Sequence, residues 1–193
     1  MHQLLTYFSA QPPFSTDDLG HIDAAFKPKT YRKGDYLLQQ GQTNRHLWFI
    51  ERGVLRLFET VSDGTEQTFY FVSAGGLMVD LESFHQQVPS AVNLQALTDC
   101  QTRAVSHDGF GRLLHDLPAW GPVTQRIAER ALLEKVQKQT RLLHEDAKAR
   151  YVRLVTEQPD VVRQVALGII ASYLGITLPS LSRLRKQLAV KHA

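Results

Sequence analysis

Cysteine is nearly absent from this sequence. Cys100 is the single cysteine among 193 residues, which excludes an intrachain disulfide, a zinc site built on cysteines and a cysteine-ligated iron–sulfur cluster. We expect Cys100 to be a small buried apolar residue, and the alternative is a redox-sensing thiol.

Signatures of targeting and catalysis are also missing. The first eight residues lack the basic start and long apolar core of a signal peptide, and no apolar run is long enough to span a membrane. The sequence contains no phosphate-binding glycine loop, dinucleotide fingerprint or carboxylate pair. Its eight histidines are scattered, without the spacing of metal or haem ligands. We therefore expect a cytoplasmic protein that is not an enzyme and holds no metal.

Ser106-His107-Asp108 has the residue types of a catalytic triad. Consecutive residues point away from one another, whereas a triad is assembled in space. The segment is better interpreted as the end of a strand that caps a helix over residues 109–114.

Acidic side chains are missing after Asp160, although five cations follow it. Residues 1–125 contain 9 Lys and Arg against 13 Asp and Glu, a net charge of −4, whereas residues 126–193 contain 13 against 6, a net charge of +7. This asymmetry indicates a polyanionic partner for the C-terminal part of the chain. A membrane surface would also attract the charge, but no basic amphipathic helix with an aromatic face accompanies it.

Residues 167–188 have the pattern of a helix-turn-helix. Ala171 stands where two helices must approach closely, and Gly175 stands where the first helix ends with a positive φ. Thr177 is a good N-cap for the second helix, and Pro179 in its first turn costs no hydrogen bond. A small shared core is expected from Ile170, Leu174, Ile176, Leu181, Leu184 and Leu188.

The outward face of the second predicted helix indicates its partner. It has short hydroxyls and cations and no acid: Ser180, Ser182, Arg183, Lys186 and Gln187. A solvated face usually mixes both signs of charge, so a helical hairpin packed into a core is the weaker alternative. The motif and the charge together predict a double-stranded DNA partner.

The N-terminal part has a different texture. Two short helices are expected over residues 3–26, and a capping serine or threonine starts the second. From Lys27 to Ser106, glycine turns separate short apolar runs at 36–38, 47–50, 54–58, 67–72, 92–96 and 101–106, and Asp63-Gly64 predicts a hairpin. Short strands at this spacing predict an all-β roll or barrel.

One long helix is expected from Pro118 to about residue 144. Its apolar stripe has the spacing of a coiled coil and consists of Val123, Ile127, Ala131, Leu133, Val136 and Thr140. Because this stripe is long for one small neighbouring domain, it predicts a two-fold dimer. Packing of the helix on its own β domain is the alternative.

The order of these elements resembles that of the Crp/Fnr superfamily of bacterial transcription regulators, which join a cyclic-nucleotide-binding-type domain to a DNA-binding domain. Residues 31–41 and 47–57 look like the first strands of that domain, and residues 80–84 and 89–97 look like its phosphate-binding cassette. Residues 170–177 and 181–185 closely match the helix-turn-helix of a subgroup. The resemblance covers nearly the whole chain and implies a sensory β roll.

The cassette departs from cyclic-AMP-binding members at two positions. Asp80 falls at or near their ribose-binding glutamate, and Pro89 falls where they have an arginine for the cyclic phosphate. Without a guanidinium the phosphate loses its bidentate partner, so Asp80, Glu82, Pro89 and Ser90 are expected to form a degenerate pocket. Cyclic nucleotides are not expected to bind, unless Arg52, Arg56 or Arg103 replaces the missing arginine; an unknown small effector remains open.

The fold class expected is α+β, in three parts. Residues 1–117 form the roll with its flanking helices, residues 118–145 form the dimerisation helix, and residues 146–193 form an all-α helix-turn-helix domain. Relatives continue past the recognition helix into a β wing, and because this sequence stops at Ala193 the wing is expected to be absent.

The function expected is that of a homodimeric DNA-binding transcription regulator. Arg183 is the expected base reader, and Leu178 can touch a thymine methyl. The other DNA contacts are expected from Arg163, Thr177, Ser180, Ser182, Arg185 and Lys186. RNA polymerase is a further candidate partner. The alternative function is a ligand-binding signalling module whose helix-turn-helix serves protein association.

Overall fold

The computed structural model describes residues 2–11, 13–142 and 145–190. Two short helices come first, α1 (Gln3–Ser9) and α2 (Thr16–Ala25). Ser15 caps α2 by accepting a hydrogen bond from the Asp18 backbone N–H, and the Asp18 carboxylate accepts one from the Ser15 backbone in return. The two helices expected at the N-terminus are therefore present.

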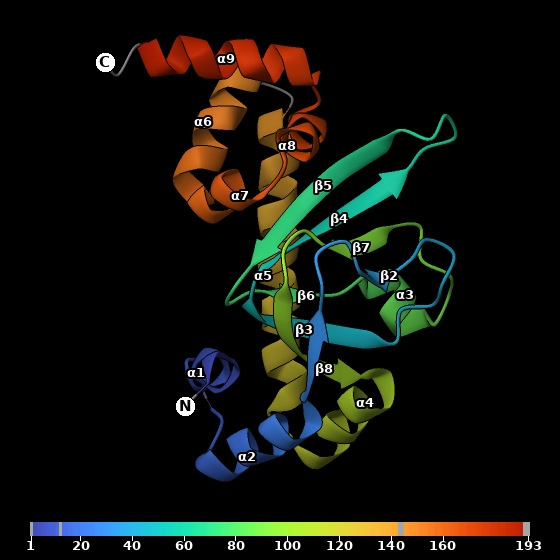
Figure 1. Ribbon diagram of the computed structural model, residues 1–193. Coiled ribbons are helices and arrows are strands. Elements are labelled where there is room, and N and C mark those ends of the chain that lie inside the picture. Colours follow the sequence, from blue (N-terminus) through green and yellow to red (C-terminus); the bar gives the residue numbers. More distant parts are fainter. Residues whose placement is uncertain (1, 12, 143–144, 191–193) are drawn as a thin grey trace.

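Eight strands form two antiparallel four-stranded sheets that face one another as a roll (Figure 1). The first sheet has the order β1 (Lys27–Tyr31), β8 (Cys100–Ser106), β3 (His46–Arg52) and β6 (Leu77–Met78). The second has the order β2 (Tyr36–Leu38), β7 (Asn93–Ala96), β4 (Val54–Thr60) and β5 (Glu66–Ser73). All six predicted runs are strands, and β4 and β5 form the hairpin predicted at Asp63-Gly64.

The roll has an apolar interior. Strand residues of both sheets fill it, among them Leu38, Trp48, Ile50, Leu55, Val72, Met78, Leu94 and Ala96. Between β6 and β7 the chain forms the short helix α3 (Leu81–Gln86) at the site of the expected cassette.

A second core lies at the end of the roll, where α1 and α2 meet α4 (His107–Asp116). Ser106 caps α4 by accepting a hydrogen bond of 3.1 Å from the Gly109 N–H, so the capping interpretation of Ser106-His107-Asp108 is confirmed. Trp120, fully buried, packs against Phe8 and Phe110 in this core.

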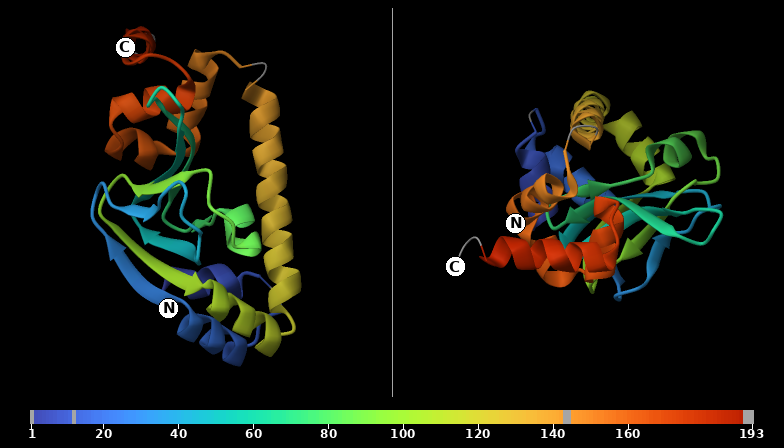
Figure 2. Two further views of the ribbon diagram at one scale, coloured as in Figure 1. Left: turned by 90° about the vertical axis from the view of Figure 1, so that its right-hand side faces the viewer. Right: turned by 90° about the horizontal axis from the view of Figure 1, so that it is seen from above.

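The long helix α5 (Trp120–Leu142) starts in this second core and then leaves it. Val123 is fully buried and Ile127 is half-buried against the same cluster. From Glu129 to Gln137 every side chain is exposed. Figure 2 shows α5 as a column beside the roll, uncovered over this stretch.

The C-terminal part is helical: α6 (Ala147–Glu157), α7 (Pro159–Gln164), α8 (Leu167–Leu174) and α9 (Leu178–Val190). Helix α7 is not among the elements expected from the sequence. It begins with Pro159 at its first position, where a missing N–H costs nothing. Residues 145–190 contain no strand. The α+β class, with a roll and an all-α C-terminal part, is confirmed.

Candidate DNA-binding surface and sensor cassette

The helix-turn-helix is built from α8 and α9, whose axes differ in direction by 95°. Gly175 ends α8 with φ +67°, the left-handed conformation that glycine adopts without strain. Ala171 is buried between the helices, and Ile170, Leu174 and Leu181 have no exposed surface. The predicted turn and shared core are therefore present.

The start of α9 is organised by a chain of three side chains. The Thr177 hydroxyl accepts a hydrogen bond of 3.3 Å from the Ser180 backbone N–H and lies 3.0 Å from the Ser180 hydroxyl. The Ser180 hydroxyl in turn accepts one of 3.3 Å from Nη2 of Arg183. This chain directs the Arg183 guanidinium toward the first turn of the helix.

Most of the predicted DNA-contacting residues lie together on α9. Ser180 and Ser182 are half-buried. The others are exposed: Thr177, just before the helix, and Leu178, Arg183, Arg185 and Lys186 within it. Arg163 lies apart on α7 and pairs with Asp160. The structure thus brings all but Arg163 onto one helix.

Helix α9 lies at the end of the molecule opposite α2 (Figure 1). Seen from above in Figure 2, it crosses this end with no other element over it. Its position leaves it open to a large partner.

A contact that sequence analysis missed joins the helix-turn-helix to the roll. The Ser172 hydroxyl of α8 accepts a hydrogen bond of 3.0 Å from the Thr68 N–H and donates one of 2.6 Å to the Glu66 carbonyl. Gln67 donates one of 2.8 Å to the Ser172 carbonyl, and the Phe71 and Tyr173 rings pack with centroids 4.9 Å apart. Strand β5 is at the edge of its sheet, so Ser172 satisfies backbone groups that a neighbouring strand would otherwise pair.

The cassette around α3 is closed by its own hydrogen bonds. The Asp80 carboxylate caps α3 and accepts a hydrogen bond of 2.6 Å from the buried Ser90 hydroxyl. Pro89 is exposed and pairs with Thr43 in an isolated bridge. Asp80, Pro89 and Ser90 are thus close together, whereas Glu82 is exposed on α3.

Two of the three candidate replacement arginines are held elsewhere. Arg56 is 4 % exposed, donates to Gln95 and Glu66 at distances between 2.6 and 3.0 Å, and lies over the Phe58 ring. Arg103 donates to Asp23 at 2.9 Å and to Glu51 at 3.1 Å. Arg52 is exposed at the end of β3.

Cys100 lies between strands, 2 % exposed. Burial raises the pKa of its thiol, which donates to the Thr98 carbonyl at 3.2 Å. A protonated, buried thiol is a poor nucleophile, in agreement with the expected packing role.

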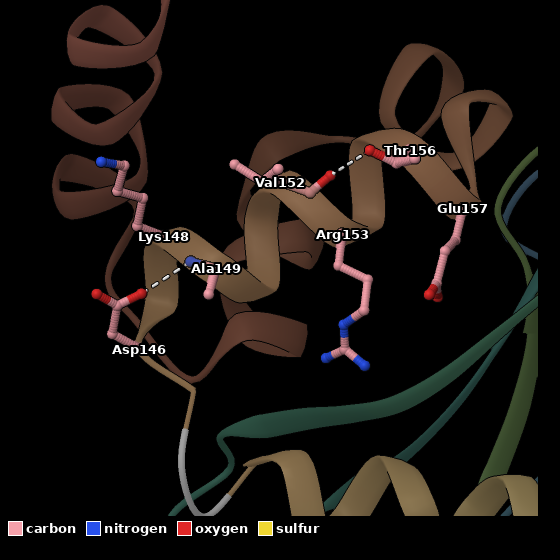
Figure 3. Close-up of a pocket in the computed structure, with 7 residues that line it drawn as sticks. All are labelled: Asp146, Lys148, Ala149, Val152, Arg153, Thr156 and Glu157. Atoms are coloured by element: carbon pink, nitrogen blue, oxygen red, sulfur yellow. Dashed lines mark hydrogen bonds between the residues drawn. The ribbon is translucent and has the colours of Figure 1, made fainter.

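A shallow hollow of about 560 Å³ lies along α6 (Figure 3). Seven α6-region residues line it: Asp146, Lys148, Ala149, Val152, Arg153, Thr156 and Glu157. Asp146 caps α6 through Ala149, and Arg153 pairs with Glu145 at 2.7 Å. The hollow shares no residue with the predicted sensor pocket.

The described part of the chain contains neither a metal-binding cluster nor a membrane-spanning helix. No three His, Cys, Asp or Glu residues within it are grouped so as to hold a metal ion. No single helix there is long and apolar enough to cross a membrane.

The roll is similar to a known domain family. Residues 28–116 match the cyclic nucleotide-binding domain family. No curated protein sequence matches the chain significantly.

Solved structures extend the likeness to the whole chain. The catabolite activator protein of Thermus thermophilus is 20 % identical, with a TM-score of 0.59 over 94 % of this chain and 86 % of that one. FixK2 of Bradyrhizobium japonicum is 18 % identical, with a TM-score of 0.70 over 86 % of each chain. The c-di-GMP responsive global regulator CLP of Xanthomonas campestris is 17 % identical, with a TM-score of 0.70 over 92 % of this chain and 93 % of that one. The chain therefore has the same overall fold as these three proteins, a fold that its sequence indicated.

Proposed function

We propose that this protein is a transcription regulator that binds double-stranded DNA as a homodimer. The observation that carries the proposal is the open face of α9, where Arg183, Arg185 and Lys186 are exposed and no acidic side chain follows Asp160. A cationic helix on the end of a molecule, positioned by a second helix behind it, fits the major groove.

Within this proposal, some side chains at α9 contact bases and others contact the phosphate backbone. Arg183 makes a bidentate contact to a guanine edge, while Ser180 and Ser182 contact bases or phosphates. Thr177, Arg185 and Lys186 bind the phosphate backbone, which positions the helix without reading sequence. Arg163 remains a candidate for a backbone contact only if its pairing with Asp160 is exchanged for a phosphate.

The second copy of the chain is proposed to pair along the uncovered part of α5. Leu133 and Val136 are 63 % and 49 % exposed, and Ala131 and Thr140 are exposed beside them. Val123 and Ile127 already pack within their own protomer, so the proposed seam lies beyond them. Two-fold pairing would place two copies of α9 about 34 Å apart, one turn of DNA.

The roll is proposed to work without cyclic AMP, either as a scaffold or as the site of a less anionic effector. The closed cassette at Asp80 and Ser90 and the engaged Arg56 and Arg103 support this view. Because its proposed target is DNA, we place the protein in the cytoplasm.

The test is selection of bound duplexes from a random DNA library, followed by titrations at several salt concentrations. We expect a palindromic site and an affinity that falls steeply with salt as counterions are released. Arg183→Ala should weaken the selected site by about 1–3 kcal/mol and relax one base preference in each half-site. Lys186→Ala should weaken all sequences alike and lower the salt slope by about one.

Absence of sequence selection and of salt dependence would contradict the proposal. It would favour a signalling module whose helix-turn-helix binds protein. If Arg183→Ala lost equal affinity for selected and random DNA, Arg183 would not be a base reader. The proposed DNA binding itself would stand.

A further inference from the structure

Leu178 is the first residue of the recognition helix and is 46 % exposed. From α9, three leucines pack in the apolar cluster of the C-terminal part: Leu181, Leu184 and Leu188. Leu178 is not among the described members of this cluster. Folding therefore gains little from this leucine, which adds apolar surface to an otherwise polar and cationic face.

The surroundings of Leu178 make the first turn of α9 half apolar and half polar. Pro179, exposed next to it, also has no side-chain donor or acceptor. The hydroxyl of Ser180 is engaged by Thr177 and by the guanidinium of Arg183. The exposed groups at this end of the helix therefore include two apolar side chains and the remaining donors of Arg183.

The major groove of DNA offers a matching pair of features. The C5-methyl of thymine is its characteristic apolar group, and the O6 and N7 atoms of guanine accept from arginine. First-turn residues of a recognition helix are those that reach base edges. A methyl group is thus the base feature that a leucine can read, because contact removes apolar surface from water on both sides.

We infer that Leu178, with Pro179 beside it, determines specificity by binding a thymine methyl group in the same half-site as the guanine read by Arg183. This inference rests on the proposed function. It adds the prediction that the selected half-site contains at least one thymine that is recognised through its methyl group.

The test replaces thymine with deoxyuridine, which pairs identically but lacks the methyl group. Each thymine of the selected half-site is replaced in turn, and affinity is measured at fixed salt. We expect one replacement to weaken wild-type binding about fourfold, the effect of one buried methyl group. With Leu178→Ala, the thymine and deoxyuridine duplexes should bind equally.

The matched control is Val155→Ala, which shortens a similarly exposed apolar side chain (40 %) on α6. This variant should keep the full thymine preference, and Arg183→Ala should keep it as well. The inference is overturned if no replacement changes the affinity of the wild type, or if Leu178→Ala is as sensitive to the replacements as the wild type. In both cases the proposed function stands, as long as binding is sequence-selective. If the library yields no enriched sequence, the proposed function fails and the inference fails with it.

Discussion

At the scale of single residues, the polar groups of the cassette are already bound to one another. A cyclic phosphate entering there would need a cation, yet Arg56 is buried between Glu66 and Gln95. Turning this guanidinium toward another anion would leave Glu66 without its partner, and breaking a partly buried ion pair is costly. Ser90 would also have to release Asp80. The side chains thus favour the closed arrangement.

His46 gives a residue-scale prediction about pH. Burial, together with the nearby Lys29 ammonium, lowers the pKa of His46, whose Nε2 lies 3.0 Å from Nζ of Lys29. The unfolded chain, with an ordinary histidine pKa of about 6.5, takes up a proton more readily than the folded one. We expect the stability that neutral His46 contributes above pH of about 6.5 to be lost as the pH falls toward its lower folded pKa.

Thermal unfolding of wild type and His46→Gln at pH 7.5 and pH 5.5 measures this effect. The variant should lose less stability on acidification than the wild type. His115→Gln is the control, because the His115 side chain is 90 % exposed. Equal acid sensitivity in wild type and His46→Gln would contradict the prediction.

At the scale of elements, α5 is held at one end and exposed along much of its length. Trp120 and Val123 near its start are buried, whereas every side chain from Glu129 to Gln137 is exposed. An isolated helix with an exposed apolar stripe is stabilised when another helix covers it. The double substitution Leu133→Asp with Val136→Asp should therefore give monomers with a folded roll. Each apolar side chain that the proposed dimer buries contributes about 1.5–3 kcal/mol to the free energy of association.

Sedimentation and circular dichroism distinguish this outcome from unfolding. Leu114→Asp, at a 48 % exposed position on α4, should leave the association state unchanged. An intact dimer in the double variant would move the interface away from α5.

The helix α8 gives a second prediction at this scale. Removing the Ser172 hydroxyl leaves the buried Thr68 N–H without its partner, at a cost of about 1–3 kcal/mol. Ser172→Ala should therefore speed amide hydrogen exchange at Thr68 by about tenfold or more, as α8 separates more often from β5. Ser182→Ala, on the outer helix, should not change this rate, and unchanged exchange in Ser172→Ala would mean that the hydroxyl does not hold the two parts together.

Local sequence signals explain which elements could be predicted. The apolar strands and the helix-turn-helix around Gly175 could be predicted because each has a pattern that spans only a few residues. Strand β1 contains Lys27, Pro28 and Lys29, and only its edge position tolerates the proline, so it had no apolar run to reveal it. The Ser172 contact joins residues 104 to 106 positions apart, and Val123 is buried by distant N-terminal helices. Such contacts depend on the tertiary arrangement and have no local signature.

At the scale of the whole molecule, charge and architecture coincide. The acidic N-terminal part contains the roll, and the cationic C-terminal part has α9 at the far end of the molecule (Figure 1). Ser172 and Phe71 connect the two parts, so β5 and α8 join the roll to the C-terminal helices by direct contacts.

Cyclic nucleotides provide the test at this scale. Calorimetry with the full chain should show no binding of cyclic AMP or cyclic GMP at micromolar concentrations, and DNA affinity should not change when they are added. The reason is that the phosphate would lose its hydration without gaining a matched cation. Pro89→Arg places a guanidinium beside Ser90 and should raise the affinity for both nucleotides, whereas Pro89→Ala should not. Micromolar binding by the wild type would show that Arg52, Arg56 or Arg103 leaves its present position to hold the phosphate.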